Sequence, residues 1–209
     1  GATHVRVASA PGGFSADLDG AGAAGHIDYQ RNPASVKAHL DHLLLEPQAK
    51  DVGETPPSSE PFDPASAPTL DVRCEQLKMS DMLLGTLSLH TTRVADGQRL
   101  DAFEVSQGKL SLKAAGTWRR TPGGSSAETG FSLKTEDISP LLTAFGYQDT
   151  VQAHHAEFIG QLAWPKTSQG LTLARAQEKV KLDLGDGVLK SVDGSNAGRA
   201  LGLLNLYAL

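Results

Sequence analysis

Residues 108–118 read GKLSLKAAGTW, and this stretch decides the class of fold. Its even-numbered positions carry Gly, Leu, Leu, Ala, Gly and Trp, whereas its odd-numbered positions carry Lys, Ser, Lys, Ala and Thr. Successive side chains of a β-strand point to opposite faces, so this alternation predicts a half-buried strand. One face of the sheet is expected to be apolar and the other solvated, as in many antiparallel sheets.

The same alternation recurs on both sides of this stretch. It is found in the segments 83–89, 131–134, 156–164 and 180–184. Turn signals such as Asp96-Gly97 separate the segments. A strand of nine residues spans roughly 30 Å, so the chain is predicted to be mainly β, with a largely antiparallel sheet that has one apolar face.

The remaining sequence divides around a proline-rich stretch. Residues 1–45 alternate in the same way and are expected to form a β segment of the sheet. Residues 46–69 hold six prolines with Ser, Glu and Asp between them, a composition that cannot bury a core. This stretch is expected to be a flexible loop or an insertion between two strands. Residues 70–209 are predicted to be a further β segment that ends in an apolar helix.

Two short helices are expected in this last region. The first spans about 137–146, because Ser139 and Pro140 suit the N-cap and the first helical position and Gly146 suits the C-terminal end. The second spans about 196–209, where leucines surround the helix almost completely. Packing against the end of the sheet is favoured over membrane binding, because the polar face of this helix lacks basic residues.

Composition excludes several classes of protein. The net charge of −5 argues against a nucleic-acid partner, because phosphate binding needs an excess of Lys and Arg. No run of residues approaches the length of a membrane span, and no signal peptide stands at the start. The chain opens at Gly1 without an initiator methionine and stops inside an apolar segment, so it is expected to be a piece of a longer protein.

The sequence contains two patterns that suggest a cofactor or a metal site, but the residues around them do not fit such a site. Residues 20–25 read GAGAAG and match the dinucleotide fingerprint, but that fingerprint needs a buried strand before it and a helix after it. Both flanks alternate instead, so these glycines are expected to connect a hairpin. His39 and His42 are three residues apart, which places them on opposite faces of a strand. Neither a cofactor nor a metal site is therefore predicted.

No constellation of residues supports catalysis. Cys74 is the only cysteine, so no internal disulfide forms, and its acidic neighbours Asp71 and Glu75 raise the pKa of a thiol. Cys74 is interpreted as a structural residue. Neither a nucleophile elbow nor a phosphate loop is present. The chain is not expected to be an enzyme, and a hydrolase screen with saturable turnover would overturn this interpretation.

Several motifs, taken in order, resemble a known family. They are AAGTW at 114–118, DISPLL at 137–142, LAWP at 162–165 and LGDGVL at 184–189, followed by AGRALGLLNL at 197–206. In this order they resemble the C-terminal part of the AsmA-like superfamily, specifically its large YhdP branch. The resemblance covers residues 70–209 well and residues 1–45 loosely. The last motif is the most specific of the set.

This resemblance implies a fold and a role in the cell. YhdP-like proteins are anchored in the inner membrane of Gram-negative bacteria by a helix that this sequence lacks, and they extend through the periplasm. Their fold is a long, curved sheet with an apolar concave face. They are implicated in moving phospholipid toward the outer membrane, and no catalytic residues are carried over. The implied partners are phospholipid acyl chains, neighbouring segments of the same chain and other envelope proteins.

The residues expected to face lipid lie on the apolar face of the strands. They are Leu87, Leu89, Leu110, Leu112, Phe131, Leu133, Phe158, Leu162, Trp164, Leu182 and Leu184. A two-layer β protein also hides one apolar face against protein, so the sequence leaves a closed core and an open groove as alternatives. The alternative function is a non-catalytic structural or protein-interaction module of the cell envelope.

Overall fold

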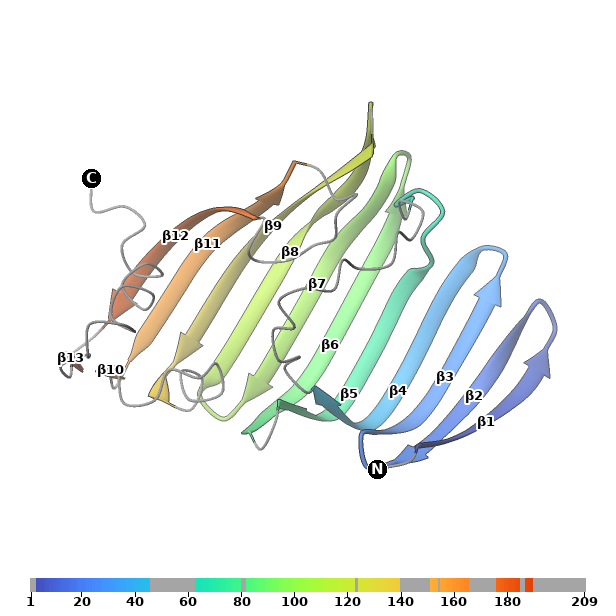
Figure 1. Ribbon diagram of the computed structural model, residues 1–209, viewed down its shortest axis with the longest axis horizontal. Coiled ribbons are helices and arrows are strands. Elements are labelled where there is room, and N and C mark those ends of the chain that lie inside the picture. Colours follow the sequence, from blue (N-terminus) through green and yellow to red (C-terminus); the bar gives the residue numbers. More distant parts are fainter. Residues whose placement is uncertain are drawn as a thin grey trace, which may run out of the picture.

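The computed structural model describes residues 3–45, 63–79, 82–122, 124–139, 151–153, 155–165, 176–184 and 187–189. An 11-stranded sheet dominates this part of the chain, with the strands in the order β1 to β9, then β11 and β12 (Figure 1). A separate two-stranded sheet pairs β10 with β13. The strands are β1 Thr3–Ala10, β2 Gly13–Gly20, β3 Ala23–Arg31, β4 Ala34–Leu45, β5 Thr69–Met79, β6 Met82–Val94, β7 Gly97–Gln107, β8 Leu110–Thr121, β9 Gly124–Thr135, β10 Val151–Ala153, β11 Ala156–Trp164, β12 Gln177–Leu184 and β13 Gly187–Leu189.

The large sheet is an antiparallel meander with one exception. β4 and β5 run parallel, with Ser35 opposite Thr69 and Leu45 opposite Met79. Two parallel neighbours cannot be joined by a hairpin, so the connection between β4 and β5, residues 46–68, joins opposite ends of the two strands. The proline-rich stretch of the sequence is this connection, and the strands on either side of it belong to one sheet.

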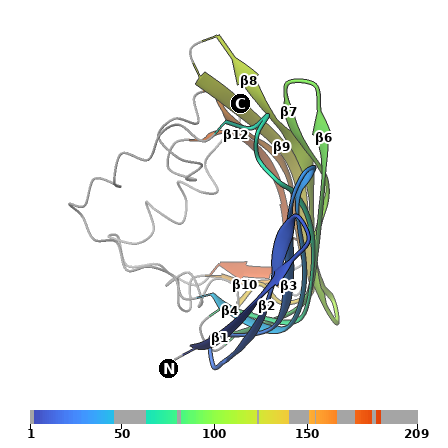
Figure 2. The same ribbon diagram turned by 90° about the vertical axis from the view of Figure 1, so that its right-hand side faces the viewer.

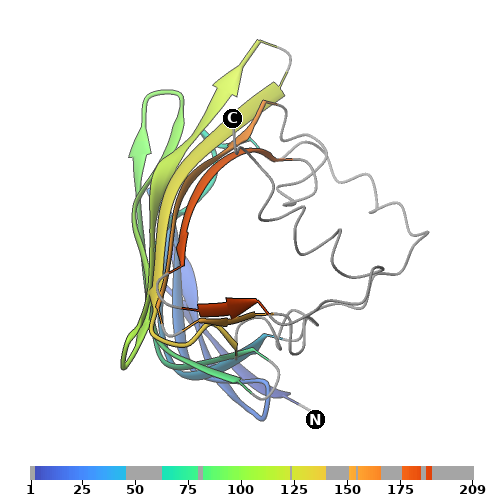
Figure 3. The ribbon, with the colours of Figure 1, turned by 90° about the vertical axis from the view of Figure 1, so that its left-hand side faces the viewer.

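The sheet is curved and has a single layer in the described part of the chain. Viewed along its long axis it forms an open arc, with strand ends at both tips of the arc (Figures 2 and 3). The prediction of a mainly β, largely antiparallel, curved sheet is confirmed.

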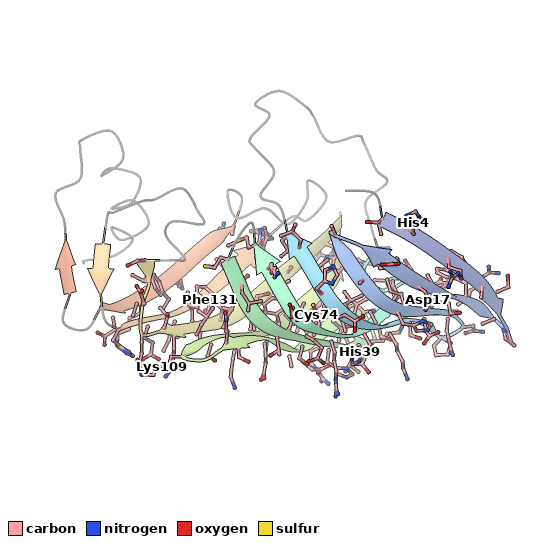
Figure 4. All side chains as sticks on the ribbon, turned by 90° about the horizontal axis from the view of Figure 1, so that it is seen from below. His4, Asp17, His39, Cys74, Lys109 and Phe131 are labelled. Carbon is pink, nitrogen blue, oxygen red and sulfur yellow. The ribbon has the colours of Figure 1, made fainter. Side chains whose placement is uncertain are left out.

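The strand register separates an inner face from an outer face. We define the inner face as the side of the sheet on which Leu112 lies and the outer face as the side of Lys113. One inner row crosses six strands in register, as Leu87, Val105, Leu112, Leu133, Phe158 and Leu182. The neighbouring outer rows carry Ser, Thr, Lys, Glu and Asp, with Ile159 as the one apolar exception. In Figure 4 the labelled His39 lies on the convex side and Cys74 toward the concave side, so the inner face is concave.

β-Bulges interrupt the alternation at a few positions. The register between β3 and β4 shifts at Ala24 and Gly25, and the register between β5 and β6 shifts near Gly85. Gly25 has a φ of 138° and Gly85 a φ of 97°, a region that favours glycine. The bulge at Gly85 moves Leu83 opposite Lys78 on the outer face, where it is 38% exposed. The expectation that Leu83 and Leu87 share a face is therefore wrong.

The most buried cluster lies at the centre of the inner face. The cluster consists of Leu40 from β4, Cys74 and Leu77 from β5, and Val105 from β7. β6 lies between β5 and β7. Half-buried apolar side chains surround the cluster, among them Leu43, Leu87 and Leu112. A single curved layer buries these residues because concave curvature crowds side chains together. Stability of the sheet therefore depends on the same face that carries the candidate site.

The two expected helices are not supported. No helix is among the elements of the described part of the chain, and residues 140–146 and 196–209 lie outside that part. Asp137 and Ile138, which follow β9, belong to neither a strand nor a helix, and Ile138 is buried. Among the residues that the structure describes, we find no helix with the length and hydropathy needed to span a membrane.

Candidate functional site

The candidate site is the inner face of the large sheet. The register places all eleven predicted lipid-facing residues on this face, drawn from β6, β8, β9, β11 and β12. Phe131 pairs with Ala114 and Gly160, and Leu162 pairs with Thr129. The predicted residues therefore form one continuous surface. The reason is that period-two alternation in antiparallel neighbours keeps each apolar series on one side.

Most of these side chains are only partly covered. Leu87, Leu89, Leu110, Leu112, Phe131, Leu133, Phe158 and Leu162 are half-buried. Trp164 is buried, with 8% of its surface exposed. The side chains of Leu182 and Leu184 lie outside the described residues, although their backbone pairs in register with Phe158 and Ala156.

The inner face continues over strands that the list of candidates omitted. Val5 and Val7 of β1 are 56% and 62% exposed, and Phe14 of β2 is 41% exposed. Val5 pairs with Leu18 and Val7 with Ala16, so all of these residues lie on the inner face. The signal for them was the same alternation in residues 1–45. In the described residues the apolar surface therefore runs along the sheet from β11 to β1.

The outer face is charged and solvated. Cross-strand pairs join Lys113 to Glu104 at 3.6 Å and Lys134 to Glu157 at 2.8 Å. The hydrogen bond from Lys134 holds the pKa of the Glu157 carboxyl below its usual range. Such exposed pairs contribute little stability. They leave the two faces with opposite character, one ionic and one aliphatic.

A short segment of the connection covers one end of the inner face. Asp63 pairs with Arg120 of β8, and the Arg120 guanidinium holds the pKa of the Asp63 carboxyl below its usual range. The Gln98 Nε2 group donates to the Ala67 carbonyl at 2.8 Å, and the Arg93 Nη2 group donates to the same oxygen at 2.8 Å. Gln98, Arg93 and Arg120 all stand at inner-face positions. Residues 63–68 therefore cross the ends of β6 to β8 on the concave side, as Figure 2 shows.

Cys74 is a structural residue of the inner face. It is 1% exposed within the central cluster. Burial raises the pKa of its thiol, and the charge of Glu75 adds to the effect. The structure therefore agrees with the interpretation of Cys74 as an unreactive side chain.

Histidines and acidic residues do not assemble a metal site in the described residues. His39 and His42 are opposite Arg73 and Gln76 of β5, on the outer face. The expectation that they occupy opposite faces is wrong, because the bulge in β4 inserts an extra residue between them. The protonated Nε2 of His42 donates a hydrogen bond to the Gly20 carbonyl oxygen at 2.9 Å.

A shallow hollow of about 910 Å³ lies on the outer face, not on the inner one. Its lining includes Thr117, Glu128, Gln161 and Lys179, which are outer-face residues. The hollow forms over Gly130, where an added Cβ would meet no atom closer than 3.9 Å. Its lining mixes polar and apolar atoms, and the register places most of its residues on the outer face.

Comparison with known proteins gives one match. A family model described as YhdP protein matches residues 1–209, the whole of the chain. No curated protein matches the chain, and no solved structure does.

Proposed function

The chain belongs to the YhdP family, and from that premise we propose that it is a segment of a bridge that conducts phospholipid between the inner and outer membranes of a Gram-negative cell. The lipid tails lie along the inner face while the outer face stays in the aqueous periplasm. The full-length protein is held at the inner membrane. The segment acts by shielding the tails and carries out no covalent chemistry.

The observation that supports this proposal most is the partial exposure of the inner face. Large apolar side chains such as Val5, Val7 and Phe14 are more than two-fifths exposed. Soluble proteins rarely leave a contiguous apolar surface of this kind without a partner. Phospholipid tails are a suitable partner because they need an extended apolar surface and no specific pocket.

The energetics favour a continuous wall over a set of pockets. Exposing two sixteen-carbon tails to water costs on the order of 25 kcal/mol at about 0.8 kcal/mol per methylene. A few hydrogen bonds cannot offset that cost. An unbroken apolar face replaces one apolar environment by another at each step, so the lipid moves without a deep minimum or a high barrier. Eleven strands spaced by about 4.8 Å give such a face a length of roughly 48 Å.

Photo-crosslinking tests the proposal at single residues. A benzophenone amino acid at Phe131, on the inner face, is expected to capture phospholipid in cells, because this side chain lies among Leu112, Leu133 and Phe158. The matched control is the same amino acid at Ser132, the next residue of β9, which pairs with Lys113 on the outer face. Mass spectrometry of the purified adducts identifies the lipid. Equal capture at both positions, or capture at Ser132 alone, would contradict the proposal.

One observation favours the alternative of an interaction module. Every residue of β1 is exposed, and β1 forms one edge of the sheet. An exposed edge strand can pair with a strand of another segment or partner. Sedimentation of the lipid-free protein distinguishes the two functions. Stable self-association without lipid, together with no crosslinking at Phe131, would support the module and not the bridge.

A further inference from the structure

The two edges of the inner face differ in chemistry. We call the end of the inner face at which β3, β6, β8 and β11 finish the Trp edge. Its inner-face positions include Tyr29, Arg31, Arg93, Trp118, Arg120 and Trp164. The Leu edge is the opposite end. Its inner-face positions include Leu43, Leu45, Met79, Met82 and Leu110. Figure 1 shows the Trp edge along the top of the sheet and the Leu edge along the bottom.

Aromatic side chains with a polar group gather at the Trp edge. Both tryptophans of the chain stand in one row, Trp118 and Trp164, on either side of Ala127. The Trp118 Nε1 group donates to the Ser125 hydroxyl at 3.2 Å. Trp and Tyr favour the boundary between hydrocarbon and water, because each combines an apolar ring with a hydrogen-bonding group.

Positive charge gathers at the same edge. Arg120 is paired with Asp63, but Arg93 donates only to main-chain carbonyls of Ala65 and Ala67 in the contacts of the described residues. Carbonyl oxygens orient the guanidinium without cancelling its charge. Arg93 is exposed, so N–H groups remain to bind an anion. The backbone of Glu178 pairs in register with Leu162, which puts one acidic residue at this edge, whereas the five Leu-edge positions named above are all uncharged.

We infer that the inner face orients its lipid across the strands, with the headgroup phosphate at the Trp edge and the tails toward the Leu edge. This inference rests on the proposed function and adds a direction to it. Arginine binds phosphate through paired N–H groups, and the tryptophans lie at the depth of the ester region. The aliphatic side chains of the Leu edge have no group to offer a headgroup and match the tails.

Tryptophan fluorescence tests this orientation in the unaltered protein. Because both tryptophans lie at the Trp edge, the intrinsic emission reports that edge alone. The protein is loaded with phosphatidylcholine that carries a nitroxide on the headgroup, or with phosphatidylcholine that carries it near the end of an acyl chain. The headgroup nitroxide is expected to quench the emission at least twofold more. Equal quenching, or stronger quenching by the chain-end nitroxide, would overturn the inference.

A relocated tryptophan gives the reverse pattern. The variant W118F/W164F/L110W moves the emission to the Leu edge, where the chain-end nitroxide is expected to quench more strongly. The unaltered protein decides the question even where this variant folds poorly. If neither nitroxide quenches while Phe131 still crosslinks lipid, the orientation is wrong and the proposed function stands. If both the quenching and the crosslinking fail, the proposed function falls.

The role of Arg93 is tested by charge removal. Arg93→Gln is expected to weaken binding of phosphatidylglycerol from vesicles by about threefold, the size of one exposed charge contact. Arg119→Gln is the matched control, because Arg119 lies at the same edge on the outer face and pairs with Asp96 at 3.3 Å. If the two substitutions weaken binding equally, Arg93 does not bind the headgroup.

Discussion

His26 shows how the outer face distributes charge at the scale of one residue. Its ring lies between two carboxylates, with Nδ1 2.6 Å from Asp17 Oδ1 and Nε2 3.2 Å from Asp28 Oδ1. The hydrogen bond to Asp17, and then that to Asp28, raise the pKa of His26 above its ordinary value of 6.5. Two acceptors on opposite ring nitrogens are satisfied together only by the charged imidazolium.

This arrangement predicts how the stability of the folded chain changes with pH. Because the folded pKa is raised, the contribution of His26 to stability is complete below its unfolded pKa and is lost as the pH rises through the folded pKa. Asp17→Asn is expected to lower the pKa of His26 more than Asp28→Asn does, as measured by NMR titration of the imidazole. An unchanged pKa in Asp17→Asn would show that the pair does not form in solution.

Two glycines on paired strands test the packing of the elements. At Gly160 of β11, an added Cβ would lie 2.7 Å from the Lys179 carbonyl oxygen and 2.8 Å from Cε1 of Phe131, so the ring occupies the space of the missing side chain. At Gly130 of β9, on the other face, the nearest atom would be 3.9 Å away. The two positions are therefore a matched pair.

Gly160→Ala is expected to lower the free energy of unfolding by about 1–3 kcal/mol, because the Phe131 ring has to move. Gly130→Ala is expected to leave it unchanged or to raise it by up to about 1 kcal/mol, because alanine reduces the freedom of the unfolded chain. Urea unfolding of the two variants measures both values. A loss in Gly130→Ala as large as that in Gly160→Ala would contradict the packing of β9 against β11.

Sequence alternation predicted the strands well, and it failed where an element contains a bulge. The eleven candidate residues fall on one face because their strands keep period two through each register. Leu83 was expected on the face of Leu87, and His42 on the face opposite His39. Both expectations are wrong, because a bulge adds one residue to a strand and reverses the alternation beyond it. The parallel pairing of β4 with β5 was also beyond the sequence, because strand order depends on contacts across the 46–68 connection. Gly25 and Gly85, which lie at the bulges, were the residues in the sequence that could have indicated them.

In the whole molecule, the face that stabilises the sheet is also the face proposed to bind lipid, and this limits what a mutation can separate. The central cluster of Leu40, Cys74, Leu77 and Val105 stabilises the curve, and Leu112 packs against it. The two edges of the inner face differ in chemistry, as Arg93 and Leu110 show. A substitution on the inner face therefore tests function only when its cost to stability is measured beside it.

Leu112→Asp provides that test, because a closed core and an open face respond differently to the same charge. A sealed interior would leave the carboxylate buried and unpaired, at a cost of about 3–5 kcal/mol or more. On a half-covered face the carboxylate stays hydrated, so the loss is expected to be about 1–3 kcal/mol, within the usual range for single substitutions. Lipid crosslinking at Phe131 is expected to fall by more than tenfold, because a charge in the path of the tails costs at least ~1.4 kcal/mol. Ser111→Asp, the outer-face neighbour, is expected to change neither quantity. Unfolding of Leu112→Asp at neutral pH, with normal crosslinking in any folded remainder, would show that the inner face is a core and not a path for lipid.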